Sequence, residues 1–177
     1  MGEDLSTSLD MESLVNYLIV YNVCGNREPV WPKSVYLYKG GADDVYHFGP
    51  IWDFDWGFTY NDGVENQVTD KLLLEMFDYP QYGGPFLMQI SKTPEFRALY
   101  KEKFDHFKTE LYPLLLEYMD EYADQIEPSA IENGVVWPVE PGRTEGSFDF
   151  RANVEKLKAW IADRVEFISC LLYTSPS

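Results

Sequence analysis

The stretch DMESLVNYLIVYNVCGN, residues 10–26, most constrains what this chain can fold into. It is typical of a helix, because Asp10 can cap the start, Glu12 suits the positive end of the helix dipole and Gly25 can end it. Two apolar stripes run along it: Leu14, Leu18 and Tyr21, and Val15, Ile19 and Val23. A helix that is apolar on two sides is usually buried on two sides. The rest of the chain must therefore pack around this helix.

Helical spacing returns later in the chain, and one β-hairpin stands between. The hairpin is predicted from residues 35–39 and 45–52, and further helices from residues 93–111, 113–126 and 149–169. The fold class is therefore α+β, mostly helical. We expect one domain over residues 1–169 and a tail over residues 170–177, where the composition turns to Ser and Pro.

Charge and apolar content exclude several classes of function. The net charge is −16, from 30 acidic and 14 basic residues among 177. Binding to a phosphate backbone needs basic patches, so we expect no nucleic-acid partner. No apolar run approaches the roughly 18 residues of a membrane span. The two cysteines, Cys24 and Cys170, make neither a disulfide framework nor a zinc cluster.

The decapeptide GPIWDFDWGF, residues 49–58, places Asp53 and Asp55 among aromatic and aliphatic residues. A carboxylate in apolar surroundings needs compensation. From the residues alone, one interpretation is a turn in which both acids accept backbone hydrogen bonds or pair with a cation.

The order of buried helix, irregular loop, hairpin and acidic turn resembles the C-terminal (lower) lobe of protein kinases. The residues resemble a narrower group, the CotH kinase family of atypical, spore-coat-type protein kinases. The resemblance lies in SLVNYLIVYNVCGNRE, WPKSVYLYK, GPIWDFDWGF, TPEFRALYKEKF and VEKLKAWIADRVEFI. It covers most of residues 10–169.

The resemblance implies roles for five residues. Asp53 takes the place of the DFG-type aspartate, which holds a divalent ion, and Asp55 is the second acid if the backbone stays extended. Oxygen ligands suit Mg²⁺ or Mn²⁺. Where the family has a catalytic Asp this chain has Glu28, one methylene longer, and Lys33 or Ser34 stands where the family has an Asn near the nucleotide.

The resemblance also implies an activity: metal-dependent transfer of a phosphoryl group from ATP to Ser or Thr of a protein. The sequence contains no G-x-G-x-x-G loop and no Val-Ala-Ile-Lys-like strand. We therefore expect a fragment whose partner is an N-terminal lobe of the same protein, and which alone binds ATP weakly and transfers no phosphate at a useful rate. The resemblance further suggests an extracytoplasmic or cell-surface location.

Other interpretations of the same residues remain open. Trp31, Trp52 and Trp56 are simplest as core or cleft-wall aromatics, but could form a platform for a glycan or protein on a non-catalytic cell-surface module. The paired acids could also serve a metal-dependent hydrolase.

Ordinary structural roles also compete for several polar residues. Glu28 suits a solvated loop acid, and Lys33 suits a side chain that packs its stem on an aromatic ring or points to solvent. His47 and His106 suit structural or surface positions. Asn16 and Asn22 suit partners of buried backbone groups.

Overall fold

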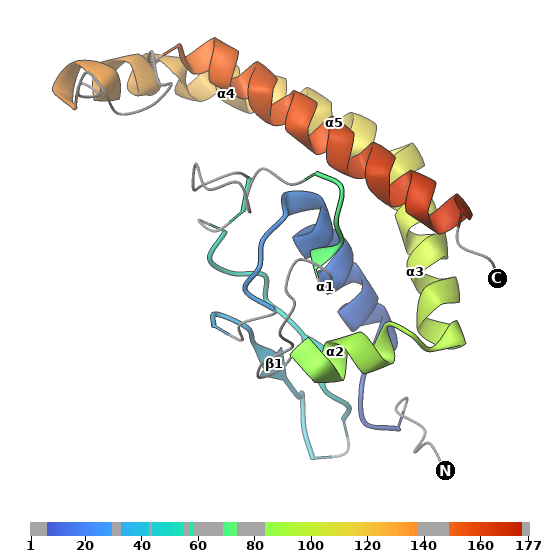
Figure 1. The fold of residues 1–177 in the computed structure, drawn as a ribbon. Helices are drawn as coiled ribbons and strands as arrows, with labels where there is room; N and C mark the ends of the chain where they lie inside the picture. Colours follow the sequence, from blue (N-terminus) through green and yellow to red (C-terminus); the bar gives the residue numbers. More distant parts are fainter. Residues whose placement is uncertain are drawn as a thin grey trace.

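The computed structural model describes residues 7–29, 33–42, 44–54, 57–58, 69–73, 84–137 and 149–174. Its regular elements are α1 (Met11–Cys24), β1 (Leu37–Tyr38), β2 (His47–Phe48), α2 (Gly84–Ile90), α3 (Pro94–His106), the π-helical turn η4 (Phe107–Leu111), α4 (Tyr112–Val136) and α5 (Phe150–Thr174). Helices dominate, and β1 and β2 form a small antiparallel sheet, which confirms the α+β, mostly helical class (Figure 1). Within the described residues, no helix has the length and apolar character needed to cross a membrane.

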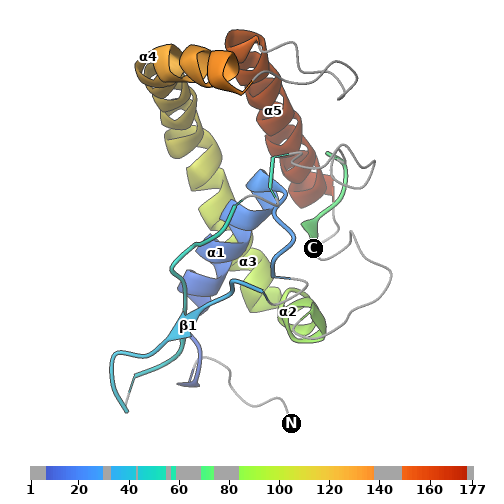
Figure 2. The same ribbon diagram turned by 90° about the vertical axis from the view of Figure 1, so that its left-hand side faces the viewer.

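Helix α1 has the central position that its two apolar faces predict. The Asp10 carboxylate accepts hydrogen bonds from the N–H groups of Glu12 (3.0 Å) and Ser13 (3.2 Å), and Gly25 ends the helix in the left-handed conformation with φ 62°. Both stripes are buried: Leu14, Val15, Leu18, Ile19, Tyr21 and Val23. The helix packs against α3, α5 and β2, and so lies between the hairpin and the C-terminal helices (Figure 2).

The two asparagines of α1 have different surroundings. Asn22 is buried; its amide donates to the Tyr100 hydroxyl (3.1 Å) and accepts from the Leu73 N–H (2.8 Å). Asn16 is exposed, so the expectation of a buried role is wrong there. The reason is that Asn16 shares the third face of the helix with Glu12, outside the two apolar stripes.

The hairpin is shorter than predicted but has the predicted direction. β1 and β2 pair antiparallel, with Leu37 opposite Phe48 and Tyr38 opposite His47. The hairpin is fastened to the start of α1, because the Asp10 N–H donates to the Tyr46 carbonyl (2.9 Å) and the Phe48 N–H donates to the Ser13 hydroxyl (3.0 Å). The chain therefore enters residues 49–54 from a strand that is fixed against α1.

The next helices begin where the sequence indicates and continue further. Thr93 caps α3, with Pro94 in the first turn, as predicted. Pro113 lies at the start of α4 after η4, whose wider turns suit a residue without an N–H group. α4 continues to Val136 through Pro128, beyond the predicted end at residue 126.

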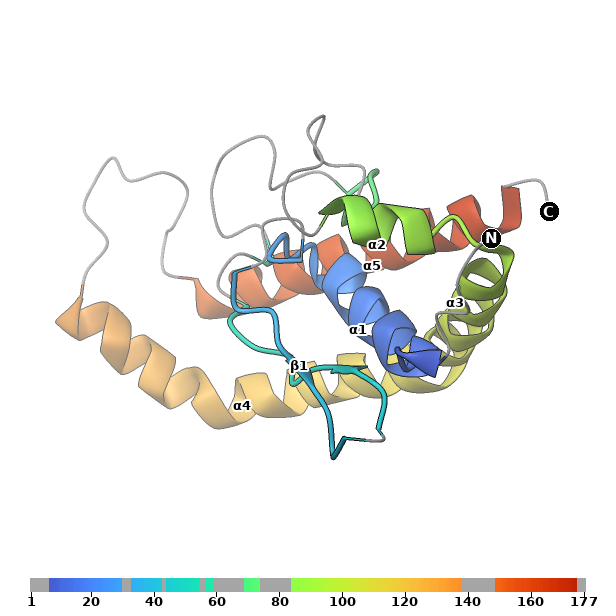
Figure 3. The ribbon, with the colours of Figure 1, turned by 90° about the horizontal axis from the view of Figure 1, so that it is seen from below.

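Helix α5 lies along α4 at one edge of the molecule (Figures 1 and 3). Arg151 on α5 pairs with Asp124 (2.7 Å) and Glu127 (2.6 Å), and Lys158 pairs with Asp120 (2.7 Å). α5 ends at Thr174 rather than at residue 169, so the first five residues of the expected tail, 170–174, continue the helix. Helical spacing does not extend clearly into CLLYT, which is why the sequence placed the end too early.

A buried arginine joins α5 to the end of α1. The Arg164 side chain has no exposed surface, and its guanidinium donates to the carbonyl oxygens of Asn22 (2.6 Å), Thr69 (3.0 Å) and Lys71 (2.6 Å). Burial lowers the pKa of Arg164 below its ordinary value. Three carbonyl acceptors replace the water that the cation loses, so this contact fixes the end of α1, from which the candidate site begins.

Candidate functional site

The site begins in the loop that leaves α1. Gly25 is required at its position, because its φ is positive and a Cβ there would lie 2.8 Å from the Trp160 ring. The turn brings the Asn26 N–H to the Tyr21 carbonyl (3.0 Å) and buries the Asn26 side chain completely. The Asn26 amide oxygen then accepts a hydrogen bond from the Glu28 N–H (3.0 Å). The loop is thus folded back on the end of its own helix.

Asp53 follows the hairpin and turns sharply. Its φ is 62°, a conformation that is uncommon for a residue with a side chain and that recurs at functional sites. The Asp53 carboxylate is exposed and accepts a hydrogen bond from the Ser34 hydroxyl (2.9 Å). Ser34 also has a positive φ, of 50°. Two strained residues, one before the hairpin and one after it, therefore present their oxygen atoms to each other.

The α1 loop and the acidic turn are in direct contact. The Asn26 amide donates to the Asp53 carbonyl (3.0 Å), and the Phe58 N–H donates to the Cys24 carbonyl (2.8 Å). Gly57 fits closely, since a Cβ at that position would lie 3.0 Å from the Cys24 carbonyl oxygen. The structure therefore places the loop that carries Glu28 beside the turn that carries Asp53.

Glu28 is buried, with 4% of its surface exposed, and is not the solvated loop acid that the residues alone suggest. Tyr17 of α1 lies near it. The Tyr17 and Tyr21 rings stack with centroids 4.2 Å apart, and the Tyr21 hydroxyl donates to the Trp52 carbonyl (3.2 Å). Burial chiefly, with smaller contributions from Tyr21 and the Glu28 charge, raises the pKa of Tyr17. The Tyr17 phenol therefore stays neutral at physiological pH.

The remaining predicted site residues are placed less closely. Lys33 is exposed and adjoins Ser34 in the chain. Asp55 lies outside the described residues. The prediction that Asp53 and Asp55 face the same side required an extended backbone. It is wrong at Asp53, whose backbone has the left-handed conformation. The sequence could not show this turn, because a short turn flanked by apolar residues has the same composition as the end of a strand.

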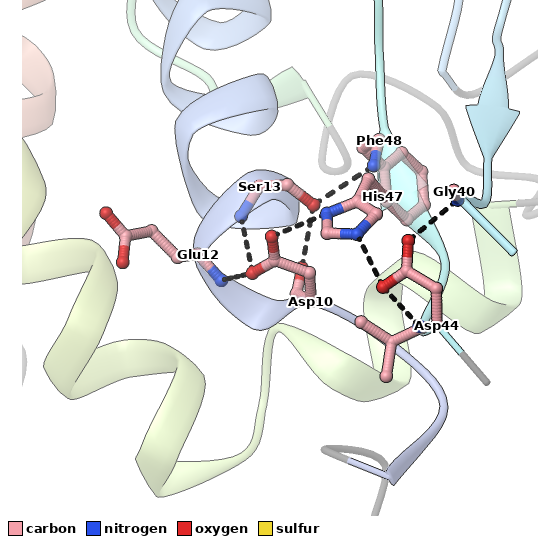
Figure 4. A network of polar contacts seen from close by, with 8 residues as sticks. Asp10, Glu12, Ser13, Gly40, Asp44, His47 and Phe48 are labelled. Carbon is pink, nitrogen blue, oxygen red and sulfur yellow. Dashed lines mark hydrogen bonds and ion pairs between the residues drawn. The ribbon is translucent and has the colours of Figure 1, made fainter.

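A polar network supports the hairpin beside the site (Figure 4). His47 lies between two carboxylates, with Nδ1 2.8 Å from Asp10 and Nε2 3.3 Å from Asp44. Asp44 also accepts from the Gly40 N–H (2.7 Å), which closes the hairpin turn. The hydrogen bonds to Asp44 and then to Asp10 raise the pKa of His47. His47 thus has a structural position, where it ties the hairpin to the cap of α1.

The donor set fits a hard divalent ion with few protein ligands. The Asp53 carboxylate and the Ser34 hydroxyl supply neighbouring oxygen atoms at an exposed position. Mg²⁺ commonly keeps several water molecules and takes one or two carboxylates together with substrate phosphates. Within the described residues, no group of three His, Cys, Asp or Glu side chains could hold a metal by itself. The arrangement suits an ion shared with a phosphate better than a fully protein-bound one.

The fold and these contacts define a mostly helical domain in which the loop of a buried acid and the turn of an exposed acid are joined at the end of a central helix. A family model described as CotH kinase protein matches residues 1–168 of the 177-residue chain, so the chain belongs to the CotH kinase family. Neither the curated proteins nor the solved structures gave a match. The interpretation as a non-catalytic aromatic platform gains no support. Of its three tryptophans only Trp52 lies within the described residues, where it is exposed, so no shared surface of Trp31, Trp52 and Trp56 is described.

Two residues at the site were not identified as functional from the sequence. Asn26 and Tyr21 hold the backbone of Asp53 and Trp52, but both look ordinary in the sequence: a polar residue after a helix-ending Gly, and an aromatic in an apolar stripe. The usable signal was that Asn carries both a donor and an acceptor on a short side chain, which suits a buried crossing point between two loops.

Proposed function

We propose that this domain belongs to a protein kinase that transfers the γ-phosphoryl group of ATP to a Ser or Thr hydroxyl of a protein, with Mg²⁺ or Mn²⁺ bound at Asp53. The observation that carries the proposal is the Asn26 side chain, which contacts the backbone of both Glu28 and Asp53 and so joins the loop of Glu28 to the turn of Asp53. The family match adds the phosphoryl-transfer chemistry.

Each residue has a separate task in this proposal. A divalent ion, when bound, neutralises charge on the phosphates during transfer. Asp53 holds the ion, and Ser34 orients the Asp53 carboxylate through its hydroxyl. Lys33, the neighbour of Ser34 in the chain, is assigned the contact with a phosphate. Glu28 accepts the proton of the substrate hydroxyl. Asp55 is the second acid of the turn.

The metal assignment is tested by measuring how tightly the 177-residue chain binds Mn²⁺, with electron paramagnetic resonance reporting the concentration of free Mn²⁺. Asp53→Asn removes the charge but keeps the size of the side chain, so we expect Mn²⁺ affinity to fall at least about tenfold while the unfolding temperature changes little. Addition of ATP should increase Mn²⁺ affinity of the wild type, since phosphate oxygens complete the ligand set.

Asp163→Asn is the matched control, because Asp163 is an exposed carboxylate on α5 and its loss changes the net charge equally. If Asp53→Asn and Asp163→Asn bind Mn²⁺ equally well, the ion does not bind at Asp53 and the proposed site is wrong.

A further inference from the structure

Asn26 differs from the other polar residues near the site, because its side chain has no exposed surface and its amide bonds two segments of the candidate site. The nitrogen donates to the Asp53 carbonyl and the oxygen accepts from the Glu28 N–H, each at 3.0 Å. Asn22 is the nearest comparison: it is also buried, but its amide contacts Tyr100 and Leu73 in the core. The Asn22 amide thus makes its hydrogen bonds within the core, whereas the Asn26 amide connects two segments of the candidate site.

The Asp53 carbonyl is a sensitive point. The direction of the Asp53 side chain depends on how its two peptide planes are turned, and its φ of 62° is an uncommon arrangement. A hydrogen bond to the Asp53 carbonyl fixes one of these planes and so helps to fix where the carboxylate lies. The other side of the same residue is held by the Ser34 hydroxyl on the carboxylate itself. A displacement of a catalytic group by about 1 Å can reduce a rate roughly a hundredfold. Control of the carbonyl therefore has consequences for any ligand at the carboxylate.

We propose that Asn26 is a positioning residue, which sets the distance between the loop of Glu28 and the turn of Asp53 and thereby sets metal affinity at Asp53. This inference rests on the proposed function, since it requires the ion to bind at Asp53. Gly57 supports the same contact, because its Cα lies against Asn26: a Cβ at Gly57 would be 3.5 Å from the Asn26 Cβ. Asn26 therefore belongs to a tightly packed junction, where there is no free space into which its side chain could move.

The test is Mn²⁺ binding to Asn26→Ala, measured by electron paramagnetic resonance well below the unfolding temperature. Loss of hydrogen-bond partners behind a metal ligand typically reduces metal affinity about 10- to 100-fold, and we expect a fall in this range. Asn16→Ala is the matched control, because Asn16 is an exposed asparagine on α1, and it should bind Mn²⁺ as the wild type does. Asn26→Ser is the milder variant and takes the place of Asn26→Ala if that protein does not fold.

The outcomes separate this inference from the proposed function. If wild type binds Mn²⁺, Asp53→Asn does not, and folded Asn26→Ala or Asn26→Ser binds as wild type does, Asn26 is only structural and the inference is wrong while the metal site stands. If wild type and Asp53→Asn bind equally, the proposed function fails and this inference falls with it. A fall in affinity confined to the Asn26 and Asp53 variants supports both.

Discussion

Helix α5 carries two arginines in opposite surroundings, and they show how two regions of this molecule are held together. Arg164, at the end of α1, is fully buried and bonds three backbone carbonyls. Arg151, at the far end of the α4–α5 pair, is partly exposed and bonds the carboxylates of Asp124 and Glu127. The first contact fixes backbone next to the candidate site, and the second joins two regular helices.

This difference indicates where the structure tolerates change. Beside the site, irregular backbone at residues 25–28, 52–54 and 57–58 depends on particular side chains, because its N–H and C=O groups have few regular partners. In α4 and α5 most backbone groups are hydrogen-bonded within their own helix, and the ion pairs between the two helices add little to the stability. Substitutions of equal chemistry should therefore have unequal effects in the two regions.

The largest effect is expected for Arg164→Met. Methionine fills similar space, but the carbonyls of Thr69 and Lys71 would lose the Arg164 donor, and the Asn22 carbonyl would keep only the Gly25 N–H. Each buried acceptor left without a donor costs about 1–3 kcal/mol, against a total stability of about 5–15 kcal/mol for a typical domain. Urea unfolding followed by circular dichroism should show a much lower midpoint. A midpoint equal to that of the wild type would mean that Arg164 does not hold this junction.

The sequence predicted the parts of this fold that depend on near neighbours. Asp10, Gly25 and Thr93 act within a few residues of themselves, and their roles as helix caps are confirmed. The direction of the hairpin is confirmed as well, since turn residues between two β-rich segments specify it. The likeness to a kinase lower lobe stays a prediction, because the structure confirms only the mostly helical class and its small sheet.

Contacts between distant segments could not be predicted from the sequence. The Arg164 side chain bonds a carbonyl 142 residues earlier in the chain, and an arginine amid acidic and apolar helix residues gives no sign of this. Asn26 reaches the Asp53 carbonyl 27 residues away, across a turn whose left-handed backbone falls on an aspartate rather than a glycine. The roles of Glu28, Lys33, Ser34, Asp53 and Asp55 stay predictions.

An intermediate effect, dependent on pH, is expected from His47. Its pKa is raised in the folded protein by Asp44 and Asp10, so the protonated ring stabilises the hairpin. This contribution is fully present below the ordinary pKa of 6.5 and is lost as the pH rises through the higher folded value. The unfolding temperature of the wild type should therefore decline relative to that of His47→Gln as the pH rises above 6.5. Parallel curves for the two proteins over that interval would show that His47 is not stabilised in its charged form.

The smallest effect is expected for Arg151→Met, the counterpart of Arg164→Met on the same helix. The pairs of Arg151 with Asp124 and Glu127 are partly exposed, so water and salt compete for each charge. The loss of unfolding temperature should be small at low salt and should shrink further as the Debye length falls from about 10 Å at 0.1 M to about 3 Å at 1 M salt. The deficit of Arg164→Met should persist at both salt concentrations, because a buried contact with neutral carbonyls is screened much less. Equal deficits with equal salt dependence would show that exposure does not separate the two arginines.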